Sequence, residues 1–193
     1  MSIFPKEVEK RSSNPRFAGQ IARANAVGVS ASFVCGAFVR LMMLIDAESK
    51  KIGEAKFISN GCGFMVAVAD TLAEHLRERR LTELNGVSVD DLKAAIEQAL
   101  GPFPQDRVQC LQVAIESAKQ ALANHRSFII EEFAGEKALI CTCFGVSEDE
   151  IESVIRDSGA CSVEMVADAC RAGTGCGACR MMIQEMIDLP GTV

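Results

Sequence analysis

The sequence predicts an α+β domain followed by a smaller, mainly helical domain. Two patterns predict the first domain: apolar strand-like runs at residues 38–46 and 52–59 around a polar turn, and longer segments with apolar residues at helical spacing. A third observation marks the second domain, because the predicted helices become short there and six of the nine cysteines gather in the last third of the chain. We therefore expect domains at residues 1–127 and 138–193, with a junction at 127–137.

The elements of the first domain follow from local signals along the chain. The two apolar runs predict a β-hairpin turning at residues 47–51. Ser88 followed by Asp91 resembles a capping box, which begins a helix that Gly101 and Pro102 stop. The four helices expected in this domain lie at residues 5–11, 64–80, 88–100 and 106–126.

In the second domain, serine caps and glycines set the predicted helix ends. Ser147, with Glu150 three residues later, begins one helix that Gly159 ends. Ser162 begins the next, which is expected to end at Gly173. A closing helix is expected at residues 178–187.

Charge and hydrophobic patterning exclude several classes of function. The 193 residues include 20 Lys and Arg against 26 Asp and Glu, and the net charge of −6 argues against nucleic acid as the main partner. No apolar run approaches the roughly 20 residues of a membrane span, and residues 1–10 lack a signal for export. We expect a cytoplasmic protein without a membrane partner. Since no phosphate loop, serine–histidine pair or carboxylate pair stands out, we expect a protein that is not an enzyme.

Cysteine is the residue that carries chemical information in this chain. The cytosol keeps thiols reduced, so nine cysteines there indicate metal or sulfur chemistry rather than a disulfide framework. Two close pairs stand out, Cys141 with Cys143 and Cys176 with Cys179. Each pair pre-organises two thiolate ligands, and the glycines around Cys176 allow a tight approach of backbone amides to sulfur. Structural zinc usually has two to four residues between paired ligands, so the Cys-x-Cys spacing favours an iron–sulfur cluster over zinc or redox cysteines.

The sequence around these pairs resembles a known type of domain. Cys143-Phe-Gly-Val and Gly175-Cys-Gly-Ala-Cys are similar to the bacterioferritin-associated-ferredoxin type of 2Fe-2S domain, over residues 139–187. The resemblance implies a permanent 2Fe-2S centre ligated by Cys141, Cys143, Cys176 and Cys179.

Three further cysteines, Cys35, Cys62 and Cys110, are separated by 26 and 47 intervening residues. They are too far apart in the sequence to form a close pair of ligands. Cys62 and Cys110 lie at predicted helix starts, where the helix dipole lowers the pKa of a thiol. The residues alone leave two interpretations open: the three cysteines converge as thiolates in one site, or they are buried structural cysteines.

Motifs around these cysteines resemble a second family. The segments Asn14-Pro-Arg-Phe-Ala-Gly, Cys35-Gly, Gly61-Cys-Gly and Arg107-Val-Gln-Cys are similar in order and spacing to landmarks of the IscU/NifU iron–sulfur scaffold, over about residues 4–126. The resemblance implies a three-stranded antiparallel sheet with helices on one side. It also implies that Cys35, Cys62 and Cys110 receive sulfur from a cysteine desulfurase, build a labile cluster and pass it to apo iron–sulfur proteins. The whole chain is similar to a NifU-like assembly protein.

Two departures from the family pattern concern the first site. Ala37 stands where the family has Asp, and Gln109 stands where it has His. Alanine cannot coordinate a metal, and neutral glutamine is a poor ligand and no acid or base near pH 7. Water, a second protein, the second subunit of a homodimer or Gln109 would complete the site around iron, a cluster or zinc. The alternative function is a two-site redox or regulatory protein that holds its N-terminal metal or cluster without transferring it.

Overall fold

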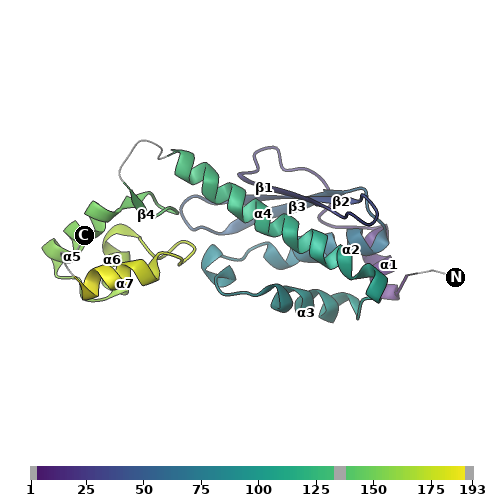
Figure 1. The fold of residues 1–193 in the computed structure, drawn as a ribbon. Helices are drawn as coiled ribbons and strands as arrows, with labels where there is room; N and C mark the ends of the chain where they lie inside the picture. Colours follow the sequence, from purple (N-terminus) through teal and green to yellow (C-terminus); the bar gives the residue numbers. More distant parts are fainter. Residues whose placement is uncertain (1–3, 133–137, 190–193) are drawn as a thin grey trace. The chain divides into compact units, whose positions relative to one another are not determined.

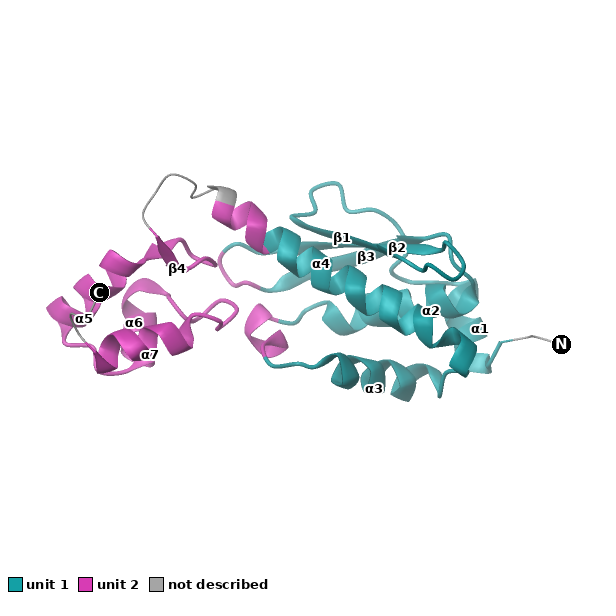
Figure 2. Ribbon diagram, in the orientation of Figure 1, with its two compact units in different colours: residues 1–47, 51–79, 86–125 teal, residues 48–50, 80–85, 126–193 magenta. Residues whose placement is uncertain are grey.

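The computed structural model describes residues 4–132 and 138–189, which fold as two compact units (Figures 1 and 2). Unit 1 contains residues 1–47, 51–79 and 86–125, and unit 2 contains residues 48–50, 80–85 and 126–193. Among the described helices, none combines the length and the apolar composition that crossing a membrane requires.

Unit 1 is built on a three-stranded antiparallel sheet in the order β1 (Ala26–Ala31), β2 (Phe38–Ile45), β3 (Ile52–Ser59). The predicted hairpin is confirmed as β2 and β3. Val39, Leu41 and Met43 alternate along β2 and are fully buried, and Met42 on the other face is 6% exposed. Both faces of this strand are therefore covered, as its apolar run predicts.

The predicted helices of the first domain are present as α1 (Lys6–Ser13), α2 (Gly63–Leu76), α3 (Val89–Leu100) and α4 (Val108–Glu132), with a short 3-10 helix η2 (Gln105–Arg107) before α4. Ser88 and Asp91 form both bonds of the predicted capping box. Helix α2 ends at Leu76, four residues earlier than predicted. Glu78 has φ 68° and its N–H donates to Ile52 O at 2.7 Å, so the chain leaves the helix to pair with the start of β3.

Helix α4 is longer than the sequence predicts and continues through residues 127–132. Ile129 is 8% exposed and extends the packed face of the helix, whereas Phe128 and Ile130 on either side of it are exposed. Residues 127–132 of the predicted junction are therefore helical, and the two compact units divide between residues 125 and 126; residues 133–137 lie outside the described residues.

Within unit 1, α4 packs directly on the sheet (Figure 1). A Cβ atom added at Gly28 of β1 would lie 2.0 Å from Ser117 O and 2.3 Å from Ala121 N, both backbone atoms of α4. Only glycine permits this approach of strand and helix backbones. The contact fixes the position of the helix that carries Cys110.

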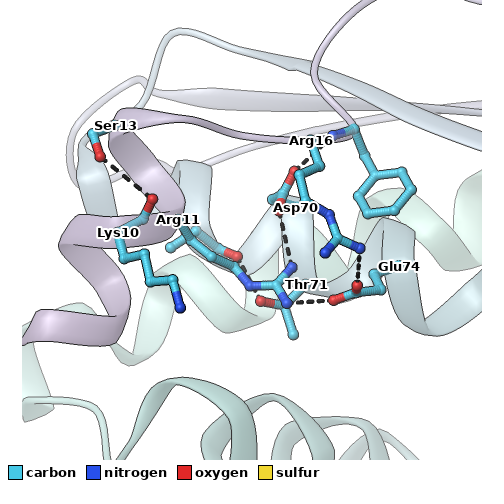
Figure 3. A network of polar contacts seen from close by, with 9 residues as sticks. Lys10, Arg11, Ser13, Arg16, Asp70, Thr71 and Glu74 are labelled. Atoms are coloured by element: carbon cyan, nitrogen blue, oxygen red, sulfur yellow. Dashed lines mark hydrogen bonds and ion pairs between the residues drawn. The ribbon is translucent and has the colours of Figure 1, made fainter.

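A buried carboxylate anchors α1 and the segment after it onto α2 (Figure 3). Asp70 of α2 is 1% exposed; it accepts from Arg11 Nη1 at 2.9 Å and from Phe17 N–H at 2.8 Å. Glu74, one turn further on, pairs with both Arg11 and Arg16. A buried charge is tolerated only when it is paired and hydrogen-bonded, and this network supplies both.

Unit 2 is mainly helical, with α5 (Glu148–Ser158), α6 (Val163–Cys170), α7 (Arg180–Asp188) and the short 3-10 helix η1 (Leu81–Leu84). It also contains a two-stranded sheet that the sequence does not predict, formed by β4 (Leu139–Cys141) and β5 (Val146–Ser147). Ile151, Val166 and Ile183 are fully buried at its core. The predicted caps Ser147 and Ser162 are confirmed by their bonds to helix N–H groups. Helix α6 ends at Cys170, before the predicted Gly173, because Arg171 takes a left-handed conformation with φ 67°.

Candidate functional site

Cys35 and Cys62 lie in loops at the same end of the sheet in unit 1. Cys35 precedes β2 and Cys62 follows β3, and since the two strands are antiparallel, both loops emerge at one end. Side chains join the loops there: Asn60 Oδ1 accepts from Phe38 N–H at 2.8 Å, and Ser59 Oγ donates to Phe38 O at 2.6 Å.

The loop that carries Cys35 is closed on itself. Ser32 N–H donates to Ala37 O and Gly36 N–H donates to Ser32 O, each at 2.8 Å, with Gly36 at φ 68°. Cys35 is exposed, and hydrogen bonds from the Ser32 hydroxyl and the Ala37 N–H lower its pKa. A thiolate that is both exposed and stabilised is the reactive form of cysteine.

Cys62 and Cys110 begin two different helices. Exposed Cys62 is the N-cap of α2, and Cys110 lies in the first turn of α4 with 1% exposure. The Cys110 thiol has its pKa raised to about 12 by burial first, and then by a hydrogen bond and the charge of Cys62 and by the charge of Cys35, against the opposing effect of Arg107. The fold therefore brings the three predicted cysteines to one edge, and a metal bound there would displace a proton from Cys110.

The positions that the family fills with Asp and His offer no strong ligand here. Ala37 is buried and carries no donor atom, and Gln109, half-buried, precedes Cys110. Across residues 4–132 and 138–189, no three Cys, His, Asp or Glu side chains converge as ligands of a single metal ion. In unit 1, Cys62 hydrogen-bonds to Cys110, whereas Cys35 acts on it through charge alone. Binding one ion with all three sulfurs would require the Cys35 loop to approach the other two.

Removing the hydroxyl of Ser32 should make Cys35 less reactive. In Ser32→Ala the pKa of Cys35 rises toward its ordinary value, because the largest stabilising hydrogen bond to the thiolate is lost. Alkylation of Cys35 by iodoacetamide near pH 7, followed by peptide mass spectrometry, should slow severalfold, and the difference should vanish near pH 10. Exposed Cys161 is the internal control. An unchanged rate at Cys35 would show that Ser32 does not set its reactivity.

The four cysteines of the second domain meet in unit 2. Cys141 ends β4, Cys143 lies in the β4–β5 turn, Cys176 lies in the loop before α7, and Cys179 is the N-cap of α7. Side-chain hydrogen bonds connect Cys141 with Cys143 and with Cys179, and Cys143 with Cys176. The two predicted pairs of cysteines therefore face each other, with Cys141 opposite Cys179 and Cys143 opposite Cys176.

Backbone amides surround these sulfur atoms. The N–H groups of Phe144 and Gly173 donate hydrogen bonds to Cys141, and the Gly173 N–H also donates to Cys179. The Cys176 N–H donates to Cys143 Sγ at 3.4 Å. Such donors stabilise anionic sulfur in iron–sulfur sites.

The backbone at Gly175 lies directly against Cys143. A Cβ atom added at Gly175 would lie 2.5 Å from Cys143 Cβ and 2.8 Å from Cys143 Sγ. Glycine at this position lets the loop of Cys176 approach the β4–β5 turn, so this glycine of the predicted motif has a steric role.

Each hydrogen bond between two of these cysteines joins one whose pKa is lowered and one whose pKa is raised. Hydrogen bonds from Cys143 and Cys179 lower the pKa of Cys141 to about 2, and a hydrogen bond from Cys143 lowers that of Cys176 to about 5, whereas the pKa values of Cys143 and Cys179 are raised. Each thiolate favoured at Cys141 or Cys176 is thus held beside a cysteine that keeps its proton. Two facing pairs of cysteines can supply the two sulfur ligands that each iron of a 2Fe-2S cluster needs.

Two cysteines of unit 2 stand outside this arrangement. Cys170 on α6 is half-buried and donates to Val166 O at 3.2 Å, close to the buried role that its position on a helix predicts. Cys161 is exposed, and its Sγ lies 3.7 Å from Met165 Sδ.

Comparisons with known proteins agree with this organisation. Residues 3–131 match the family model described as "NifU-like N terminal domain", and residues 139–188 match that of the "BFD-like [2Fe-2S] binding domain". The chain is 32% identical over 164 residues to the nitrogen fixation protein NifU of Trichormus azollae, covering 84% of this chain and 53% of the relative. It is 29% identical over 184 residues to NifU of Azotobacter chroococcum mcd 1, covering 95% and 58%.

Shorter relatives and a solved structure match the first domain. The iron-sulfur cluster assembly scaffold protein IscU of Aquifex aeolicus is 25% identical over 141 residues, 72% of this chain and 85% of that protein. The crystal structure of the N-terminal part of a nitrogen-fixing NifU-like protein from Brucella abortus shares the fold, with a TM-score of 0.50 at 14% identity over 63% of this chain and 93% of that one. This chain spans little more than half the length of the NifU relatives. Because the first family model matches two thirds of its residues, the chain belongs to the NifU-like N-terminal domain family, with a BFD-like [2Fe-2S] binding domain following it.

Proposed function

We propose that this protein is a scaffold for iron–sulfur cluster assembly that acts as a carrier and not as an enzyme. Cys35, Cys62 and Cys110 hold a labile cluster, and Cys141, Cys143, Cys176 and Cys179 hold a permanent 2Fe-2S centre. The sulfur donor is a cysteine desulfurase, and the recipients are apo iron–sulfur proteins. The observation that carries the proposal is the meeting of three cysteines, from three distant segments, at one edge of the unit 1 sheet.

Within the first site, the geometry favours Cys35 as the residue that accepts sulfur. Its thiolate is exposed and stabilised by Ser32, whereas Cys110 is buried and protonated near pH 7. The thiolate attacks the terminal sulfur of the donor's persulfide, the sulfur–sulfur bond of the donor breaks, and the donor leaves as a thiolate. Cys62 and Cys110 then provide the sulfur ligands nearest to each other for incoming iron.

The second site fits the electron supply that this chemistry needs. Persulfide sulfur must gain two electrons to become sulfide, and a 2Fe-2S centre transfers electrons one at a time. The residues of unit 2 contribute the amide donors and facing thiolates that hold such a centre. If chemical reduction of the centre leaves sulfide release from a persulfidated first domain unchanged, this electron role is rejected.

Timed cluster transfer tests the proposal against its alternative. A reconstituted chain mixed with an apo-ferredoxin should lose the labile cluster within minutes, and the ferredoxin should gain the matching iron and absorbance. Ala37→Asp, which restores an exchangeable carboxylate beside Cys35, should change the transfer rate, because a carboxylate lets ligands swap on the metal. A cluster that stays on the N-terminal site over hours would support the alternative, a redox or regulatory protein that retains its metal.

A further inference from the structure

Cations gather beside one of the two cysteine clips in unit 2. Phe144 follows Cys143, and its ring contacts two positive side chains: Lys50 Nζ lies 4.5 Å and Arg171 Cζ lies 4.2 Å from its centroid. The same ring approaches the cysteine loop, since its Cε2 would lie 3.2 Å from a Cβ atom added at Gly175. Both cations therefore lie near the Cys143 end of the site.

Lys50 is the unusual member of this group. Its residue is only 5% exposed, so its charge is largely removed from water, and a desolvated cation over an aromatic face acts strongly on neighbouring charge. Arg171 holds the segment in place, donating to Glu48 Oε2 at 2.9 Å and to Glu48 O at 2.6 Å. Because Glu48 neutralises Arg171, Lys50 is the cation with the larger net effect.

A third cation touches a sulfur atom directly. Nη2 of Arg126 lies 3.5 Å from Cys176 Sγ, within the hydrogen-bonding range of sulfur. In the same pair of cysteines, Cys179 is followed by Arg180, but the charge of Arg180 is paired with Glu164. The positive charge near the four cysteines is thus concentrated at Cys143 and Cys176.

We propose that Lys50 and Arg126 raise the reduction potential of the 2Fe-2S centre, with Arg171 as the residue that positions Lys50. This inference rests on the proposed function, which places a 2Fe-2S centre on these four cysteines. Taking up an electron makes a cluster with four thiolate ligands more negative, and nearby cations stabilise the more negative state. Lys50 and Arg126 belong to unit 2 together with these four cysteines, although both precede the ligands in the sequence.

Redox titration of the reconstituted full chain tests this, with the midpoint potential followed by visible absorption and by the electron paramagnetic resonance signal of the reduced centre. Lys50→Gln and Arg126→Gln should each shift the midpoint to more negative values, and the double variant should shift it further. Lys50→Arg should restore most of the unaltered value. Arg156→Gln is the matched control, because Arg156 is 72% exposed on α5 and pairs with Glu152, and its midpoint should not move.

Salt separates an electrostatic effect from a structural one. Raising the salt concentration should shrink the shift caused by the exposed Arg126, while the shift caused by buried Lys50 should persist. Unchanged midpoints in both variants, with the 2Fe-2S spectrum intact, would overturn this inference alone. An unaltered chain that never develops the spectrum would reject the proposed centre, and this inference with it.

Discussion

Replacing Gly28 by alanine is expected to destabilise unit 1 by about 3 kcal/mol, the upper part of the usual range for overpacking. The added methyl group would lie 2.0 Å from Ser117 O and 2.3 Å from Ala121 N. Both are backbone atoms of α4, so no side chain can rotate away and the helix itself must shift. That shift would also move Cys110 relative to Cys62.

Gly53 provides the matched control for this substitution. It is a strand glycine of β3, and a Cβ atom there would find its nearest neighbour, Leu44 O, at 3.8 Å, an ordinary contact. Urea unfolding followed by circular dichroism should place Gly53→Ala within about 1 kcal/mol of the unaltered chain. If Gly28→Ala unfolds at the same urea concentration as Gly53→Ala, α4 does not pack on β1 as described.

Replacing Arg11 by alanine is expected to cost about 3 kcal/mol, because it removes a charged partner from a buried ion. Asp70, at 1% exposure, would keep the hydrogen bond from Phe17 N–H but would lose its guanidinium. The anchoring of α1 on α2 would weaken with it (Figure 3).

Arg16→Ala is the comparison for Arg11→Ala. Arg16 is 64% exposed and pairs only with Glu74 in the network, so its loss should cost less than about 1 kcal/mol. Thermal unfolding of the two variants under identical conditions gives the difference directly. Equal melting temperatures for the two would show that Asp70 is not stabilised by Arg11 in the folded chain.

Much of the fold is predictable because its signals are local. The hairpin follows from two apolar runs around a turn, and the caps of the helices follow from serine and acidic residues at fixed spacing. The family resemblance implies a third strand, but the local pattern does not locate β1, because Gly28 and Ser30 interrupt its apolar residues. Gly28 is explained by the close approach of α4 and not by the strand. The ends of α2 and α4 also escape prediction, since tertiary pairing with β3 and burial of Ile129 decide them.

The two sites differ in the same way. The four cysteines of unit 2 form pairs that sequence spacing reveals, whereas Cys35, Cys62 and Cys110 come together only through antiparallel pairing and the approach of α4. For the first site, the resemblance to a family supplied what the residues alone left open. Lys50 and Arg126 carry no sequence signal, because they lie far along the chain from the groups that they contact, the Phe144 ring and the Cys176 sulfur.

Counting iron and acid-labile sulfide, with an absorption spectrum, after anaerobic reconstitution tests the central claim that the chain has two independent iron–sulfur sites. The unaltered chain should carry both a centre that resists chelators and iron that chelators remove. Cys176→Ser should lose the resistant centre and keep the labile one, and Cys62→Ser should do the reverse. A colourless chain without iron or sulfide, or variants that lose both sites together, would contradict the account.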